Sequence, residues 1–236
     1  VLLECEVVVL AVRDAAVPDV ATMLVGTGLV NKRHVLLHCA GAASAEELLG
    51  GVAGRVGGIG TLHPLSAIAD ARAAMRHLEG VVFGVEGDEA GRRAAEKLVA
   101  AMKGHVLPLA STQMAAYHCA AALASNYLVA ALDAAAQVLA ADGLPVAQSV
   151  QALLALAEGA LRNVAQKGTT NGLTGPARRG DAPTIRRHLE ALRAMPDVAE
   201  IYRALARRAV EIAARIDGPD APDRTGLDAI RTLLES

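Results

Sequence analysis

Aromatic side chains are scarce in this sequence. The 236 residues include one Phe, three Tyr and no Trp, so aromatics make up 2% of the chain. Proteins that bind single-stranded nucleic acid stack bases on aromatic side chains, and this composition excludes such a platform. The hydrophobic content of 53% must therefore come from aliphatic residues, which are sufficient to build a core.

An excess of basic charge is also lacking. Lys and Arg number 23, Asp and Glu number 25, and the formal net charge is −2, so no positive field is available to hold a phosphate backbone. The cysteines Cys5, Cys39 and Cys119 fit neither a zinc spacing nor a disulfide framework. They predict buried thiols in a reducing compartment and no metal site. We expect a cytoplasmic protein that binds no nucleic acid.

A secretory signal is lacking too, because no basic front or small-residue cleavage site is present. The most apolar stretch, around Tyr117 to Ala141, carries polar residues that a lipid-spanning helix rarely tolerates, among them Asn126 and Asp133. We therefore expect no membrane span. The sequence opens at Val1 within an apolar run, and we expect it to begin part-way into a longer protein.

The first half of the chain alternates short β-branched runs with helical patterns, which is typical of a mostly parallel sheet with helices on its faces. Asp14, Ser44 and Asp88 are expected to cap the three helices of this half. The strands are expected at Val7–Val12, Val35–His38, Val56–Leu62, Val81–Val85 and His105–Leu109.

After Pro108 the strand pattern stops, and the rest of the chain is predicted to be helical. We expect one long helix over Thr112–Ala141 and a second from Val146 to Gln166. Further helices are expected at Thr184–Ala194, Val198–Ile216 and Leu227–Leu234, after a glycine-rich loop. The expected organisation is an α/β domain over 1–109, a helical domain over 110–216 and a tail over 217–236.

Candidate site residues follow the predicted strands, because ligands of open parallel sheets bind beyond the carboxyl ends of the strands. Arg13-Asp14 follows the first strand, His38 ends the second, and His63-Pro64 follows the third. Two interpretations of the histidines remain open. They line a functional site, or they are turn residues satisfied by neighbouring backbone groups.

A second candidate cluster lies on the predicted long helix, where His118, Ser125 and Asn126 share one face with Asp133. Polar groups on an Ala- and Leu-rich helix must either bond to each other and to neighbouring helices or line a cavity. We favour the second alternative, in which this face closes the cleft at the end of the sheet.

Five short strings in this order resemble a family of bacterial Rossmann-like proteins that carry a C-terminal helical domain of unknown function. That family is related to pyrroline-5-carboxylate reductase, β-hydroxyacid dehydrogenases and 6-phosphogluconate dehydrogenase. The strings are Val9-Leu10-Ala11-Val12-Arg13-Asp14, Leu37-His38-Cys39-Ala40-Gly41, Leu62-His63-Pro64-Leu65, Tyr117-His118 through Ala124-Ser125-Asn126-Tyr127, and Leu173-Thr174-Gly175-Pro176. The likeness covers about Val7 to Ala214.

The resemblance implies an α/β Rossmann-like parallel sheet followed by an all-α domain, an NADP cofactor, a small-molecule substrate and a homodimer formed through the helical domain. The cofactor would lie against the residues Ala11, Val12, Arg13, Asp14 and Gly41. The substrate would contact His38, Ser125, Pro64 and Thr174, and the catalytic candidates are His118, Asn126 and His63.

Three departures from the family pattern bear on the mechanism. The family's glycine-rich phosphate loop would precede Val1, many relatives carry Ser where this chain has Ala40, and relatives often place a Lys where Gln113 and Met114 stand. A Lys-based mechanism therefore does not carry over, and His118 is the nearest replacement. The sequence favours an NAD(P)-dependent oxidoreductase acting on a small carbonyl or carboxylate compound. The alternative is a non-catalytic nucleotide-binding or scaffold protein that retains the fold.

Overall fold

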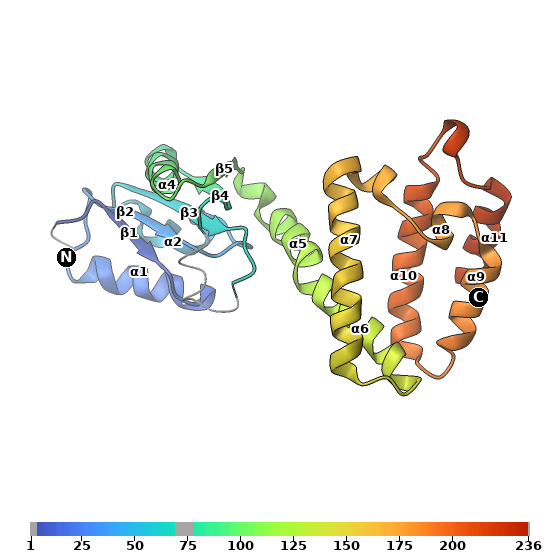
Figure 1. Cartoon of the computed structure of the whole chain (residues 1–236). Helices are drawn as coiled ribbons and strands as arrows, with labels where there is room; N and C mark the ends of the chain where they lie inside the picture. The colour runs from blue at the N-terminus through green and yellow to red at the C-terminus, as the bar shows by residue number, and fades with distance from the viewer. Residues whose placement is uncertain (1–3, 69–77, 236) are drawn as a thin grey trace. The chain divides into compact units, whose positions relative to one another are not determined.

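The chain folds into two compact units, Val1–Asn126 and Tyr127–Ser236, in a computed structural model that describes residues 4–68 and 78–235. Figure 1 shows the sheet-containing unit in blue to green and the helical unit in green to red. We expected the division near residue 110. It falls after Asn126 because the helix that follows the sheet, α5 (Met114–Ala124), contacts the sheet through Tyr117.

Five strands in the order β1-β2-β3-β4-β5 form the sheet of the first unit. They are β1 (Val7–Leu10), β2 (Val35–His38), β3 (Gly58–Pro64), β4 (Val82–Gly87) and β5 (His105–Pro108). Three of the four neighbouring strand pairs, β1-β2, β2-β3 and β4-β5, are parallel as the alternating pattern predicts, whereas β4 runs antiparallel to β3. The expectation of a mostly parallel Rossmann-like sheet is confirmed.

Helices cover both faces of the sheet because the strand residues alternate between the two (Figure 1). On one face, Leu36 and Ile59 pack with α1 (Val17–Gly26) and α2 (Ala45–Ala53). On the other face, Leu37 and Phe83 pack with α4 (Glu89–Ala101).

Two of the three expected helix caps are present. The Ser44 side chain accepts from the Glu47 amide, and the Glu47 carboxylate accepts from the Ser44 amide, which forms a complete capping box for α2. The Asp88 carboxylate accepts from the amides of Gly91 and Ile59, so it caps α4 and ties this helix to β3. Asp14 caps no helix. It begins a short 3-10 turn, Asp14–Ala16, and α1 follows from Val17.

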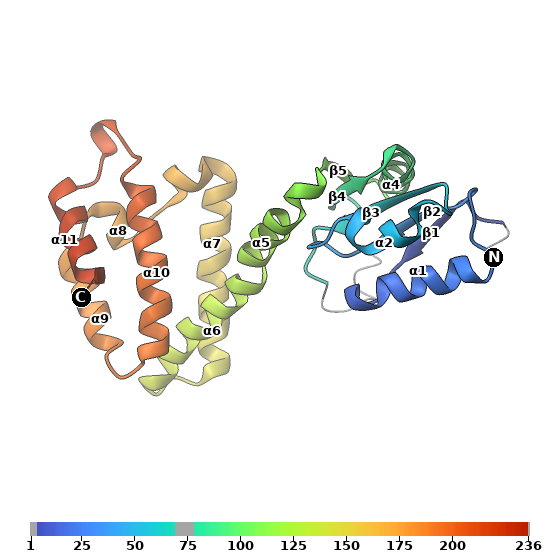
Figure 2. The same ribbon diagram turned by 180° about the vertical axis from the view of Figure 1, so that it is seen from behind.

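The second unit is helical, as expected. It holds α6 (Asn126–Ala141, whose first residue belongs to the first unit), α7 (Val146–Gly172), α8 (Pro176–Arg179), α9 (Ala182–Ala191), α10 (Pro196–Ala213) and α11 (Arg224–Glu235). Its core lies among α8 to α11, where Ile185, Val210 and Ile230 are buried. Figures 1 and 2 show these four helices gathered in the orange and red part of the chain.

The predicted single helix over Thr112–Ala141 is wrong. A 3-10 turn (Ser111–Gln113) comes first, and the helix is then interrupted at Ser125, whose φ of −121° and ψ of −75° are not helical. The apolar periodicity continues across the break, which is why the sequence did not indicate it. The second helix extends beyond the predicted Gln166, although Gly168 has a φ of +71° and kinks it.

One helical stretch in the described part of the chain, Ser111–Ala141, is long and apolar enough to cross a membrane by length and composition. A single such stretch is weak evidence for a span. The interruption at Ser125 and the polar side chains of His118, Asn126 and Asp133 do not favour one.

Candidate active site

The candidate site lies on the α1/α2 face of the sheet, near the carboxyl ends of β1, β2 and β3. Strand register places His38 opposite Thr61, and Thr61 opposite Glu86. All three side chains are buried. Because side chains two residues apart share a face, His63 follows Thr61 on this same face, and Gly84 lies opposite His63.

His38, Thr61 and Glu86 form a first row of side chains across the sheet, and this row is a continuous hydrogen-bonded chain. The Thr61 hydroxyl donates to Glu86 Oε2 at 3.3 Å and lies 3.1 Å from His38 Nε2. His38 Nδ1 accepts from the Ala40 amide at 3.2 Å. With Nδ1 accepting and the Thr61 proton used by Glu86, Nε2 must carry the proton, so His38 is neutral in this arrangement. Burial lowers the pKa of His38, which favours the same neutral form, and a backbone hydrogen bond with Ser44 opposes this shift.

This row fixes the loop between β2 and α2. Glu86 Oε2 also accepts from the Ala45 amide at 2.8 Å, at the first residue of α2. The loop is therefore held by His38 at its start and by Glu86 and the Ser44 cap at its end. Within it lies Gly41, which is buried.

Beside that loop is the second row, formed by His63, Tyr117 and His118. The Tyr117 hydroxyl lies 2.8 Å from His63 Nδ1, and the two rings meet edge to face. The ring centroids of His63 and His118 are 6.0 Å apart. A Cβ atom on Gly41 would lie 2.6 Å from His63 Nε2 and 2.8 Å from His118 Cδ2, so Gly41 permits this close packing. We call Gly41, His63, Tyr117 and His118 the His63 cluster.

The surroundings hold His63 in its neutral form near pH 7. Burial lowers its pKa first, the neighbouring His118 lowers it further, and Asp14 opposes the shift. Burial raises the pKa of Tyr117, while a backbone hydrogen bond from Gly84 lowers it. A histidine whose pKa lies near or below neutrality can both take up and release a proton, which is the property required of an acid–base group.

The end of β1 supplies exposed groups near this cluster. Ala11, Val12, Arg13 and Asp14 follow the strand and are exposed. Asp14 acts electrostatically on His38, Cys39 and His63, which places its carboxylate close to them. Within residues 4–68 and 78–235, the Arg13 side chain has no hydrogen-bond or ion-pair partner, so it is available to an anionic ligand.

These residues fit the reactive end of a dinucleotide cofactor. Ala11 and Val12 offer exposed backbone at the end of β1, and Arg13 offers a cationic group beside it. A metal site is not indicated, since the described residues contain no suitable group of three His, Cys, Asp or Glu side chains. Of the cysteines, Cys39 is half-buried and burial raises its pKa, whereas Cys119 is exposed, contrary to the expected buried thiol.

Within the first unit, the structure brings some of the predicted site residues together and leaves others apart. His63, His118 and Gly41 meet, and Pro64 ends β3 beside them. His38 lies behind the cluster with both ring nitrogens already engaged inside the protein. Ser125 is the interruption between α5 and α6, and Asn126 is exposed at the start of α6. Thr174 lies in the second unit, before α8.

Tyr117 is the residue that sequence reasoning missed. Its only signal was its place beside His118 in the string that resembles the Rossmann-like family. The contact with His63 depends on Gly84, because a Cβ atom there would lie 2.8 Å from the Tyr117 hydroxyl oxygen. The pairing of β3 with β4 that brings Gly84 to His63 is not visible in the sequence.

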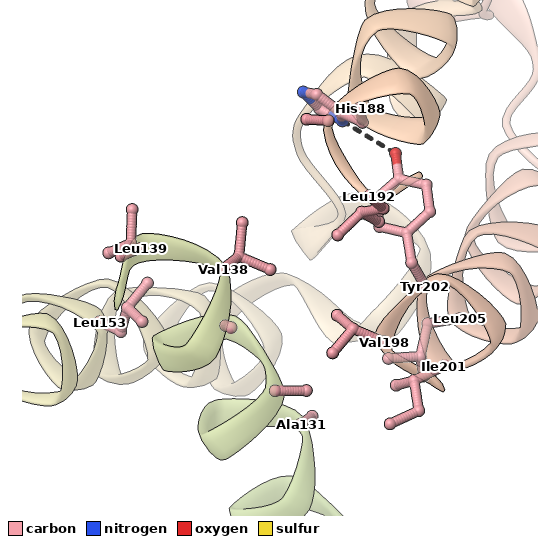
Figure 3. Close-up of a pocket in the computed structure, with 13 residues that line it drawn as sticks. Ala131, Val138, Leu139, Leu153, His188, Leu192, Val198, Ile201, Tyr202 and Leu205 are labelled. Atoms are coloured by element: carbon pink, nitrogen blue, oxygen red, sulfur yellow. Dashed lines mark hydrogen bonds between the residues drawn. The ribbon is translucent and has the colours of Figure 1, made fainter. Parts of the chain in front are cut away.

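The second unit contains a separate groove with a volume of about 350 Å³. Its walls are apolar side chains of α6, α7, α9 and α10 (Figure 3). The polar exception is a second His–Tyr pair, in which His188 Nδ1 lies 2.8 Å from the Tyr202 hydroxyl. This pair has nearly the same geometry as His63 and Tyr117, with ring planes at 88° in both cases.

A mostly parallel five-stranded sheet with helices on both faces, followed by a helical unit, defines a Rossmann-like α/β protein. The chain belongs to the family described as Domain of unknown function (DUF2520), whose profile matches residues 81–209. No curated protein matches the sequence.

Solved structures share the fold across most of the chain. Protein TM1727 from Thermotoga maritima is 27% identical with a TM-score of 0.70, and the match covers 89% of this chain and 81% of that one. Protein BF3122 from Bacteroides fragilis, provisionally described as an NADP oxidoreductase, is 23% identical with a TM-score of 0.66, and the match covers 89% of this chain and 78% of that one. Plasmodium falciparum pyrroline carboxylate reductase, solved with NADP bound, is 14% identical with a TM-score of 0.58, and the match covers 89% of this chain and 78% of that one. The expected relation to Rossmann-like reductases with a helical C-terminal region is confirmed at the level of the fold.

Proposed function

We propose that the protein is an NAD(P)-dependent oxidoreductase that acts on a small carbonyl- or carboxylate-bearing compound in the cytoplasm. The observation that carries this proposal is the His63 cluster, an acid–base group beside the carboxyl ends of β1 and β2. In related folds a nicotinamide cofactor binds at this edge of the sheet. The NADP bound to the Plasmodium falciparum reductase supports the choice of cofactor class.

When bound, such a cofactor supplies or takes up hydride, and the protein must orient the reactants and exchange the accompanying proton. Ala11 and Val12, which are exposed at the end of β1, would hold the cofactor through their backbone. Arg13 would pair with an anionic group of the cofactor or the substrate. His63 exchanges the proton, and the exposed ring of His118 lies where it can contact a substrate.

A titration of the purified full-length protein with NADPH and with NADH, followed by fluorescence or calorimetry, tests the cofactor. Saturable binding that weakens in Arg13→Ala supports the proposal. Arg55→Ala, a change to an exposed Arg before β3, is the matched control and leaves binding unchanged. Absence of binding to either nucleotide overturns the proposal and favours the non-catalytic alternative.

The non-catalytic alternative has one observation in its favour. Gln113 stands where relatives often carry a Lys, and its side chain accepts from the Ala110 amide at 2.8 Å, so it is part of the turn before α5. Incubation with NADPH and a panel of aldehydes, ketones, imines and 2-oxo acids separates the two functions. Consumption of NADPH with any of these compounds excludes the scaffold role.

We also propose that the protein is a homodimer. Support comes from α6 and α7, two helices of 16 and 27 residues whose buried residues are Ala134, Ala136, Ser149 and Gly172. Helices in water are stabilised mainly by packing of an apolar face, and these two leave theirs largely unburied within one chain.

A further inference from the structure

His63 is held by one specific partner. Its Nδ1 atom lies 2.8 Å from the Tyr117 hydroxyl oxygen, and Nε2 points the other way, toward Gly41. Histidine exchanges a proton through one nitrogen while a hydrogen bond at the other nitrogen fixes the ring and its tautomer. The contact with Tyr117 therefore determines which nitrogen of His63 is available.

We infer that Tyr117 is a positioning residue: its hydroxyl oxygen accepts the Nδ1 proton of His63 and so reserves Nε2 for the proton exchanged with substrate. This inference rests on the proposed oxidoreductase function. A Tyr hydroxyl oxygen has lone pairs that can accept the Nδ1 proton of His63 at the observed 2.8 Å, while its own proton faces elsewhere. The arrangement leaves the Nε2 lone pair directed at the edge of the loop that holds Gly41.

The proton count is balanced in both directions. In reduction, the carbon of the substrate C=X group receives hydride from the cofactor, and X receives the proton of the cationic His63 from Nε2. The electrons of that N–H bond stay on Nε2, so His63 becomes neutral. Its other proton remains on Nδ1, hydrogen-bonded to the Tyr117 oxygen. In oxidation, neutral His63 removes the X–H proton through Nε2 as hydride leaves for the cofactor.

The charges around His63 set the pH at which each direction operates. The titratable groups that face it are Asp14 beyond β1, His38 on β2, and Tyr117 and His118 on α5. Burial and His118 outweigh Asp14, which leaves the pKa of His63 below its ordinary value of 6.5. Oxidation therefore gains rate as pH rises through the pKa of His63, and reduction loses rate over the same interval.

Nitrogen NMR of ring-labelled histidine in the full chain tests the tautomer directly. We expect Nδ1 of neutral His63 to carry the proton in the wild type, both alone and with NADPH added. In Tyr117→Phe the proton moves to Nε2, because Nδ1 has lost its acceptor. Tyr202→Phe is the matched control, because it removes the equivalent Tyr hydroxyl that contacts His188 and leaves His63 unchanged.

Kinetics provide the second readout, with whichever compound of the carbonyl and imine panel consumes NADPH. His63→Gln lowers kcat about 100-fold or more, as for loss of an acid–base group. Tyr117→Phe lowers kcat less, leaves KM nearly unchanged and alters the pH profile, whereas Tyr202→Phe alters none of these. If Tyr117 had only a structural role, Tyr117→Phe would change the stability of the protein without changing the pH profile of kcat.

The results separate the two proposals. If NADPH binds and His63 carries its neutral-form proton on Nε2, the inference about Tyr117 is wrong and the oxidoreductase proposal stands. The inference is also wrong if Tyr117→Phe leaves the tautomer and the pH profile unchanged. If neither NADPH nor NADH binds, the oxidoreductase proposal is wrong, and the proton-exchange role of His63 is rejected with it.

Discussion

At the scale of single residues, Gly41 controls the His63 cluster. In Gly41→Ala the new Cβ atom would lie 2.6 Å from His63 Nε2, so the His63 ring must move away from its contact with Tyr117. Because the clash is with movable side chains, we expect a stability loss of only about 1 kcal/mol. The loss of kcat should approach the roughly 100-fold effect of removing an acid–base group. Urea unfolding and NADPH consumption measure the two effects separately.

Gly51 is the control for this substitution. It lies in α2, ten residues after Gly41 in the sequence, and a Cβ atom there would meet nothing within 4 Å. Gly51→Ala should raise the stability of the protein by about 0.5–1 kcal/mol, because Ala loses less conformational freedom in a helix. It should leave kcat unchanged. A Gly41→Ala variant that resembles Gly51→Ala in both respects contradicts the tight packing of the cluster.

Acid should destabilise the first unit through its buried histidines. The folded-state pKa values of His38 and His63 both lie below the ordinary value of 6.5, with burial as the main cause. The unfolded chain therefore binds more protons once the pH falls to about 6.5, and the free energy of unfolding decreases as the pH is lowered further. Stability is fully present above 6.5 and is lost as pH falls through the folded-state values.

Urea unfolding at a series of pH values measures this dependence. His63→Gln should reduce the loss of stability on acidification, because one of the two responsible groups is gone. The control is His105→Gln, at an exposed position that begins β5, which should leave the dependence as in the wild type. Equal slopes for the wild type and His63→Gln would show that His63 titrates alike in the folded and unfolded chain.

His38 shows what the sequence can and cannot reveal about a site residue. Its place at the end of a strand was predictable, and so was its proximity to the site edge. In its hydrogen-bond network, Thr61 lies 23 residues after His38, and Glu86 lies 25 residues after Thr61. Only strand pairing brings these residues together. The interpretation as a turn residue satisfied by neighbouring backbone groups, one of the two left open by the sequence, accounts for Nδ1, which accepts from the Ala40 amide. It does not account for Nε2, which lies beside the Thr61 hydroxyl.

At the scale of elements, the packing of α4 on β3 depends on Gly91. A Cβ atom at this position would lie 1.9 Å from the Ile59 carbonyl oxygen, a backbone atom that cannot rotate away. Gly91→Ala should therefore cost about 3 kcal/mol, at the upper end of the usual overpacking range. Glu96→Ala, at an exposed position of the same helix, should stay within about 0.5 kcal/mol of the wild type. Similar unfolding midpoints for both variants would contradict the close approach.

The elements that the sequence predicted well are those with a local signal. Capping residues such as Ser44 and Asp88, and β-branched runs such as Val7–Leu10, act within a few residues of themselves. The antiparallel direction of β4 depends instead on its pairing with β3, which no residue within β4 indicates. The break at Ser125 has no glycine or proline to announce it, so the apolar pattern of α5 continued into α6 without a visible interruption.

At the scale of the whole molecule, the proposed homodimer follows from one face of α7. Seven apolar residues on this helix fall within one stripe at helical spacing: Val146, Val150, Leu153, Leu154, Ala157, Leu161 and Val164. Four of them are large and exposed, including Val146 and Leu161 at 56% each. The stripe runs from Val146 to Val164, before the kink at Gly168, and is about 27 Å long, so it forms an extended apolar surface.

A second copy of the chain is the occupant that fits this surface. The stripe itself carries no charge that would select a basic or acidic partner, and the adjacent Glu158 and Arg162 neutralise each other in an i,i+4 ion pair. An apolar stripe of this kind is self-complementary when two copies meet about a twofold axis. Each leucine buried on association contributes about 1.5–3 kcal/mol, so the substitution of one leucine should be detectable.

Leu161→Glu tests the dimer because it places a charge in the middle of the stripe. We expect the wild type to show twice the chain mass of 24.2 kDa by light scattering at micromolar concentration, and Leu161→Glu to shift toward the monomer. Leu156→Glu is the matched control, since Leu156 is 71% exposed on the same helix but lies outside the stripe, and it should stay dimeric. A monomeric wild type contradicts the homodimer. Equal dissociation by both variants would reject the stripe as the contact surface, because a charge would then disrupt assembly wherever it stood on α7.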